Sequence, residues 1–95
     1  MYLAVRRYSD GHALVDAITP PLQATIDAAL RAIPGFRAYY LVKANDGVAI
    51  SVSVYDDQAG VDASTVAARE LIAANLPDLK LGPPEVMAGE APVAF

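Results

Sequence analysis

Residues 36–55 have the sequence FRAYYLVKANDGVAISVSVY, which predicts two strands and the turn that joins them. Both ends of the stretch are rich in β-branched and aromatic residues, which favour strands. Between them lies Asn45-Asp46-Gly47, and an Asp-Gly step is one of the strongest sequence signals for a hairpin turn. We therefore expect an antiparallel hairpin of residues 36–44 and 48–55.

A strand and a helix are predicted before this hairpin. Residues 2–8 alternate between the two sides of an extended chain and are rich in strand formers. Apolar residues then recur every four positions from Leu14 to Leu30, which is the spacing of one helix face. Thr19-Pro20-Pro21 interrupts this pattern, because proline lacks an amide donor and crowds the preceding turn. We expect a short helical entry, a break near Thr19 and a main helix to about Ala32.

A second helix and a last strand are predicted after the hairpin. Asp56-Asp57 supplies candidates for a helix N-cap, although the helix is expected to become regular only after Gly60. This second helix is expected to end at Leu76-Pro77. The last strand is expected from Glu85 to Phe95, and Pro92 inside it indicates an edge strand or a local break.

The resulting order, β-α-β-β-α-β with a tight central hairpin, is the ferredoxin-like pattern. The sequence thus predicts one α+β domain over residues 1–95, with two helices on one face of a four-stranded antiparallel sheet.

Composition excludes several function classes. Seven cations against eleven carboxylates give a net charge of −4, which argues against partners such as nucleic acid or an acidic membrane surface. There is no cysteine, and His12 is the only histidine, so the sequence implies no metal and no organic cofactor. No apolar run is long enough to span a bilayer and the chain begins with a strand-like run, so we expect a cytoplasmic protein.

Side-chain alternation divides the predicted strands into two sets. An almost purely apolar set is expected to lie under the helices: Leu3, Val5, Phe36, Ala38, Tyr40, Val42, Val48, Ile50, Val52 and Val54. The other set is rich in tyrosine, arginine and serine: Tyr2, Ala4, Arg6, Tyr8, Arg37, Tyr39, Leu41, Lys43, Ala49, Ser51, Ser53 and Tyr55. Tyrosine and arginine suit partly buried surfaces that still need hydrogen bonds. Since the apolar fraction, 55%, exceeds the usual ~45–50%, we expect this second face to meet a second copy of the chain. The two faces would form either a wet interface or a polar-lined cavity.

Several of these segments resemble one family. The segments that carry the resemblance are Pro34-Gly35-Phe36, Tyr39-Tyr40-Leu41-Val42, the Asp46-Gly47 turn, residues 51–55 and Gly82-Pro83-Pro84-Glu85-Val86. They resemble the antibiotic-biosynthesis-monooxygenase-like proteins of the dimeric α+β barrel superfamily, in a branch of small bacterial members of unassigned role. The resemblance implies a homodimer whose sheets face each other, with the last strands reaching across. It also implies relatives that include cofactor-free oxygenases of phenolic or anthrone-type substrates and haem-degrading enzymes.

The catalytic residues that the resemblance implies are not matched. The oxygenases tend to use an asparagine and a tryptophan, whereas this chain has no tryptophan and its asparagines, Asn45 and Asn75, fall in a hairpin and at a helix end. The haem-degrading members use an axial histidine, and His12 precedes the first predicted helix.

Six residues of the second face are candidate ligand-binding residues: Arg6, Arg37, Tyr39, Ser51, Ser53 and Tyr55. The arginines are suited to holding an anionic or enolate oxygen, or to an ion pair with Glu85 or Glu90 across the interface. The tyrosines are suited to acid–base or orienting roles, or simply to packing with one hydrogen bond. The serines mark small polar wall positions, since no base is placed to activate them.

The sequence leaves two hypotheses open and assigns no catalytic residue. The first is a homodimeric small-molecule-binding protein, with a small aromatic or anionic ligand and cofactor-free monooxygenase activity. The second is a non-catalytic structural or stress-related dimer without a substrate. An open pocket among the six side chains would favour the first, and a packed seam the second.

Overall fold

The computed structural model describes residues 1–95 as seven elements. They are β1 (Tyr2–Tyr8), α1 (His12–Ala17), α2 (Pro20–Arg31), β2 (Phe36–Lys43), β3 (Ala49–Tyr55), α3 (Gln58–Asn75) and β4 (Glu85–Glu90).

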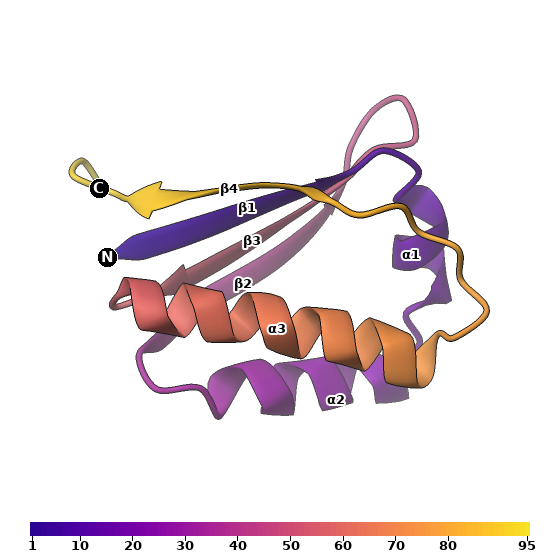
Figure 1. The fold of residues 1–95 in the computed structure, drawn as a ribbon, viewed down its shortest axis with the longest axis horizontal. Coiled ribbons are helices and arrows are strands. Elements are labelled where there is room, and N and C mark those ends of the chain that lie inside the picture. Colours follow the sequence, from indigo (N-terminus) through magenta and orange to yellow (C-terminus); the bar gives the residue numbers. More distant parts are fainter.

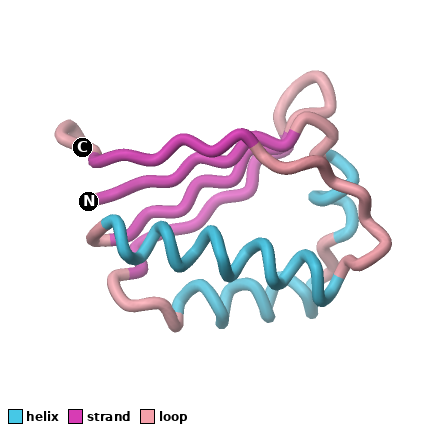
Figure 2. The backbone as a smooth tube through the Cα atoms, viewed as in Figure 1, coloured by secondary structure: helices cyan, strands magenta, loops and turns pink.

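The strands form one antiparallel sheet in the order β2-β3-β1-β4. Figure 1 shows α2 and α3 side by side on one side of this sheet, with α1 near the hairpin end. Figure 2 shows no helix on the other side, and the two chain ends lie close together. The predicted ferredoxin-like α+β fold is confirmed. None of the three helices combines the length with the apolar character needed to cross a bilayer.

The helix starts follow the capping residues in the sequence. The predicted break at Thr19 is confirmed, because Thr19 caps α2 by accepting a hydrogen bond from the Leu22 amide at 3.4 Å and Pro20 takes the first helical position. Asp57 caps α3, accepting from the Gly60 amide at 3.0 Å. The expected irregular stretch before Gly60 is wrong, since this cap lets α3 begin at Gln58.

The hairpin is confirmed and the last strand is shorter than expected. Asp46 and Gly47 both have positive φ, 58° and 76°, as a tight turn between twisted strands requires. β4 ends at Glu90 instead of Phe95. Pro92 lacks the amide hydrogen that a ladder needs, and β4 is an edge strand, as the proline indicated.

The two faces of the sheet are the reverse of the prediction. The helices cover the polar set: Arg6 is 1% exposed, and Ala4 and Ser53 are equally buried. The apolar set is on the uncovered side, where Tyr40 is 60% exposed and Met87 64%. This arrangement is stable because α3 presents hydroxyl groups to the polar side chains beneath it.

We call the uncovered side the open face. The strand registers place nine apolar side chains on it: Leu3, Val5, Ala38, Tyr40, Val42, Ile50, Val52, Val54 and Met87. Phe36 was predicted to share their face, but a register shift between Phe36 and Ala38 turns Phe36 to the helix side, where its ring meets that of Tyr55 edge-on at 5.7 Å.

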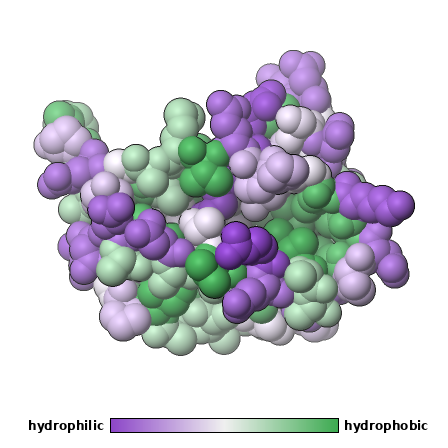
Figure 3. Space-filling view, viewed as in Figure 1, coloured by the Kyte–Doolittle hydropathy of each residue, from purple (hydrophilic) through white to green (hydrophobic).

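The helix-covered side holds two small apolar clusters. One contains Ala4, Tyr55 and Val61, and the other contains Tyr8, Leu14 and Ala49. The loop after α3 packs leucines against the second cluster. Figure 3 shows hydrophobic residues inside the curve of this loop and hydrophilic residues at the tip of the β2–β3 hairpin.

Candidate ligand site beneath the helices

A buried arginine lies between the sheet and α3. One terminal nitrogen of Arg6, Nη1, donates to Ser53 Oγ at 2.9 Å and Ser51 Oγ at 3.3 Å. The other, Nη2, donates to Ser64 Oγ at 2.9 Å and Thr65 Oγ1 at 2.7 Å. The guanidinium thus joins β3 to α3 through four uncharged hydroxyl groups.

The hydroxyl groups on α3 are oriented to accept from Arg6. Ser64 Oγ and Thr65 Oγ1 donate to the Val61 carbonyl, at 2.7 and 3.1 Å, which directs their lone pairs toward the guanidinium. No carboxylate pairs with Arg6, and its Nε has no partner. Arginine stays protonated in proteins, although burial lowers the pKa of Arg6 from its ordinary value. The site therefore carries a positive charge that no group of the chain neutralises.

Three tyrosines surround this charge. Burial raises the pKa of Tyr8, Tyr39 and Tyr55 above the ordinary value of 10.0, and the nearby Arg6 opposes that rise in each case. All three phenols are consequently protonated at neutral pH, so they serve as hydrogen-bond donors. Tyr55 already donates to the Leu30 carbonyl at 2.8 Å.

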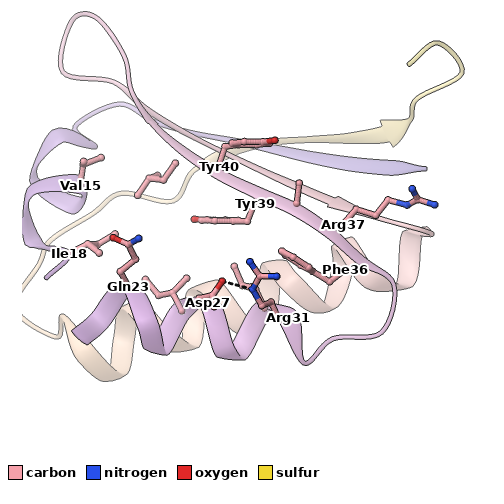
Figure 4. A pocket seen from close by; sticks show the side chains of 13 residues that line it. Val15, Ile18, Gln23, Asp27, Arg31, Phe36, Arg37, Tyr39 and Tyr40 are labelled. Carbon is pink, nitrogen blue, oxygen red and sulfur yellow. Dashed lines mark hydrogen bonds and ion pairs between the residues drawn. The ribbon is translucent and has the colours of Figure 1, made fainter. Parts of the chain in front are cut away.

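An open groove of about 560 Å³ runs between α2 and β2. The Tyr39 ring extends into it toward α2, whereas Tyr40 points to the other side of β2 (Figure 4). Most of the lining is apolar: Val15, Ile18, Ile26, Leu30, Phe36, Ala38, Tyr39, Tyr40 and Leu41. The polar lining comes from Gln23, Asp27, Arg31 and Arg37.

A second, inner cavity lies deeper between the sheet and the helices. Its volume is about 30 Å³, space for only one or two waters, and every residue that lines it is hydrophobic, including Tyr8. Five residues line both cavities: Ile18, Ile26, Leu30, Tyr39 and Leu41. Tyr39 and its neighbours thus form the wall between the open groove and the inner cavity.

The structure brings together five of the six predicted residues, on the helix-covered side. Arg6 contacts Ser51 and Ser53, and its charge acts on Tyr39 and Tyr55. The sixth residue, Arg37, does not contact Arg6: it lines the groove, is exposed and pairs with Asp56 at 2.5 Å.

The ion pair expected between Arg6 and a glutamate across the interface is wrong, because Arg6 is buried under α3. Within the chain, Arg37 pairs with Asp56 and not with Glu85 or Glu90. Tyr55 Oη is engaged with the helix backbone, which matches the packing interpretation of that residue.

The groove residues on α2 were not predicted. Gln23, Asp27 and Arg31 recur every four positions, which places them in one row beside the apolar stripe of Leu22, Ile26 and Leu30. This four-residue spacing was the feature of the sequence from which these groove residues could have been predicted.

His12 and the carboxylates form no metal site. No group of three or more histidine or acidic side chains is close enough to hold an ion. His12 Nε2 instead lies 2.6 Å from the Ala44 carbonyl, which ties α1 to the hairpin.

The buried tyrosines predict a pH dependence of stability. Because folding raises the pKa of Tyr8, Tyr39 and Tyr55, the unfolded chain loses these protons first, and the free energy of unfolding falls as the pH rises above about 10. Tyrosinate absorbance should show a late-titrating class that Tyr39→Phe reduces by one phenol. A single transition of all tyrosines in the folded protein would contradict this.

Comparisons with known proteins give matches at the level of structure. No protein-family model matches the sequence, and no curated protein does. A monooxygenase from the gene ActVA-Orf6 of Streptomyces coelicolor, solved with the ligand nanaomycin D, is similar with a TM-score of 0.70 and 22% identity, over 99% of this chain and 89% of that one. SnoaB, a cofactor-independent oxygenase from Streptomyces nogalater solved as a mutant, is similar with a TM-score of 0.67 and 16% identity, over 99% and 95% of the two chains.

A third similar structure has no assigned role. It is a protein of unknown function from Nitrosomonas europaea, with a TM-score of 0.69 and 22% identity, over 99% of this chain and 91% of that one. The three chains share the fold of residues 1–95 along almost their whole length. At these sequence identities the similarity shows a shared fold and nothing more.

Proposed function

We propose that this chain, which has the fold of the antibiotic biosynthesis monooxygenases, is a homodimeric small-molecule-binding protein with cofactor-independent oxygenase activity on a small aromatic substrate. The observation that carries the proposal is the uncompensated, buried charge of Arg6, which acts on Tyr39, a residue that lines the open groove. Support also comes from the fold shared with a cofactor-independent oxygenase.

The dimer is proposed from the open face. Nine apolar side chains cover one side of a four-stranded sheet, with Val52 at its centre between Val5 and Tyr40. Monomeric proteins rarely leave a contiguous apolar surface of this extent in water. A second copy offers the same surface, and two such sheets pack face to face in an isologous contact. The proposed partner is therefore this chain itself.

The ligand site is proposed within each chain, on the helix-covered side. The groove is about 560 Å³, within the usual range of small-molecule pockets, and its lining is mainly apolar with a few polar groups. Tyr39, protonated at neutral pH, is suited to donate a hydrogen bond to a substrate oxygen. The charge of Arg6 favours negative charge on that oxygen, because little water screens it beneath the helices.

The proposed chemistry needs no cofactor. An aromatic ketone such as anthrone has a CH2 group that its carbonyl acidifies through the aromatic rings. This group loses a proton to a solvent base to give an enolate, which carries the electrons that reduce O2. One oxygen atom becomes the new carbonyl oxygen, and the other leaves as water with the two hydrogens of the former CH2 group. The chain would contribute apolar binding, Tyr39 as a donor and Arg6 as the stabilising charge.

Oxygen consumption with anthrone as the probe substrate tests this proposal. We expect the purified protein, without added cofactor, to consume one O2 for each anthraquinone formed. Arg6→Met should slow the reaction by at least about tenfold, because it removes the charge while keeping an apolar side chain of similar length. Arg69→Gln, at an exposed position on α3, is the control and should not change the rate.

Two results would separate the proposal from its alternative. Equal rates for the wild type and Arg6→Met, both folded by circular dichroism, would remove Arg6 from the function. No oxygen consumption and no ligand binding by the wild type would favour the non-catalytic dimer. The open groove supports the ligand-binding hypothesis, although only Arg37 and Tyr39 of the six predicted residues line it.

A further inference from the structure

Three of the four polar residues of the groove lie in one row on α2. Gln23, Asp27 and Arg31 line the groove at intervals of four residues, facing a wall of otherwise apolar side chains. The polar row therefore runs along one side of an apolar channel.

Two contacts hold Arg31 in this row. Its Nε donates to Asp27 Oδ1 at 2.6 Å, and its guanidinium carbon lies 5.1 Å from the centre of the Phe36 ring. The bulge in β2 places Phe36 on this side of the sheet. The hydrogen bond to Asp27 and the contact with the Phe36 ring together orient the guanidinium plane of Arg31.

The terminal nitrogens of Arg31 are available to a ligand. They form no hydrogen bond with the protein, because Asp27 uses only Nε. Figure 4 shows them directed from α2 into the space below Tyr39, whereas Arg37 extends away from the groove. A pair of parallel N–H donors matches the two oxygens of a carboxylate.

The other end of the groove is suited to an apolar group. Toward α1 the walls are Val15, Ile18 and Leu41, and behind Tyr39 lies the wholly hydrophobic inner cavity.

We propose that the groove binds an organic acid, with its carboxylate on the terminal nitrogens of Arg31 and its apolar body between α2 and β2, directed toward Tyr39. This assignment rests on the proposed function for the groove as the ligand site, and adds the chemical class of the ligand. Asp27 orients Arg31, and its negative charge opposes the incoming anion. Removal of that charge should therefore raise the affinity for the acid.

Cinnamate and cinnamyl alcohol form a matched pair of probes, since they differ only in the acid group. Binding to the full chain is measured by calorimetry, and the site is located from amide chemical-shift changes in α2 and β2. The wild type should bind cinnamate more tightly than the alcohol. Arg31→Gln should weaken cinnamate binding by about tenfold and leave the alcohol unchanged.

Two further variants sharpen the test. Asp27→Asn should tighten cinnamate binding a few-fold, because it removes the neighbouring negative charge and keeps a hydrogen-bond acceptor for Arg31 Nε. Arg69→Gln, an exposed arginine on α3 outside the groove, removes the same net charge and should leave both affinities unchanged.

Each outcome decides between the two proposals. Equal affinity for cinnamate and the alcohol, or an equal loss of both in Arg31→Gln, overturns the acid assignment while the groove remains a ligand site. Loss of cinnamate binding in Arg69→Gln would show general charge attraction and also overturn it. Shift changes outside the groove, or no binding of either probe, would remove the groove itself and with it the proposed function.

Discussion

Val52→Asp should convert the dimer to a monomer. Val52 lies at the centre of the open face, and two-fold symmetry would bury the new carboxylate twice without a partner. Two unpaired buried charges cost about 4 kcal/mol even after partial relaxation, which raises the dissociation constant on the order of a thousandfold. Sedimentation velocity at micromolar concentration measures the shift.

The matched control for this substitution is Val66→Asp. Val66 is an exposed valine on α3, on the helix side, so the same change of side chain should leave the dimer intact. Tyr40→Asp provides a second test on the open face, since Tyr40 is already solvated in the single chain and its replacement should spare the fold. Dimers of unchanged stability in both open-face variants would contradict the proposed interface.

Gly11→Ala should destabilise the fold by about 3 kcal/mol, near the upper end of the usual cost of overpacking. An added Cβ at Gly11 would lie 2.3 Å from Ala49 Cβ and 2.7 Å from the Ala49 backbone nitrogen. Ala49 is fully buried in the central strand β3 and cannot move without shifting the sheet. Urea unfolding measures the loss.

A double-mutant cycle identifies the cause of this loss. Ala49→Gly removes the methyl group that meets the new Cβ, so adding it to Gly11→Ala should recover part of the stability, while the backbone nitrogen prevents full recovery. Gly82→Ala is the control, because nothing lies within 4 Å of its added Cβ. Additive effects of the Gly11 and Ala49 substitutions would contradict the predicted close packing of α1 on β3.

The elements of the fold were predictable because their signals are local. The Asp46-Gly47 turn, the Thr19 cap with Pro20, and Pro92 each act through backbone geometry within a few residues. Two boundaries were wrong: β4 ends at Glu90 instead of Phe95, and α3 begins before Gly60, which had been expected to delay the regular helix. Gly60 instead lies where a Cβ would come within 2.8 Å of the Tyr55 side chain, so packing requires glycine there.

The assignment of the two sheet faces could not be predicted from alternation alone. Alternation separates the side chains into two sets but does not say which set the helices of the same chain cover. The deciding interaction is Arg6 with Ser64 and Thr65, which lie about 60 positions away and whose hydroxyl groups make a buried arginine tolerable. A pair of adjacent hydroxyl residues in the middle of an alanine-rich helix was the sequence signal for it.

The candidate site was predicted in part. Arg6, Tyr39, Ser51 and Ser53 were grouped correctly because they share one face of neighbouring strands. Arg37 lines the groove with Tyr39 but does not join the residues around Arg6. The bulge at the start of β2 interrupts alternation, and a bulge leaves no clear mark in the residue pattern. The ligand-binding role of these residues stays a prediction.

Native mass spectrometry of the wild type and Val52→Asp with cinnamate tests the central claim, that the ligand site lies within one chain and leaves the open face to pair two copies. We predict a wild-type dimer that carries two cinnamates and a Val52→Asp monomer that carries one. A monomer that binds no cinnamate at concentrations that fill the wild type would contradict the account, because the site would then require both copies.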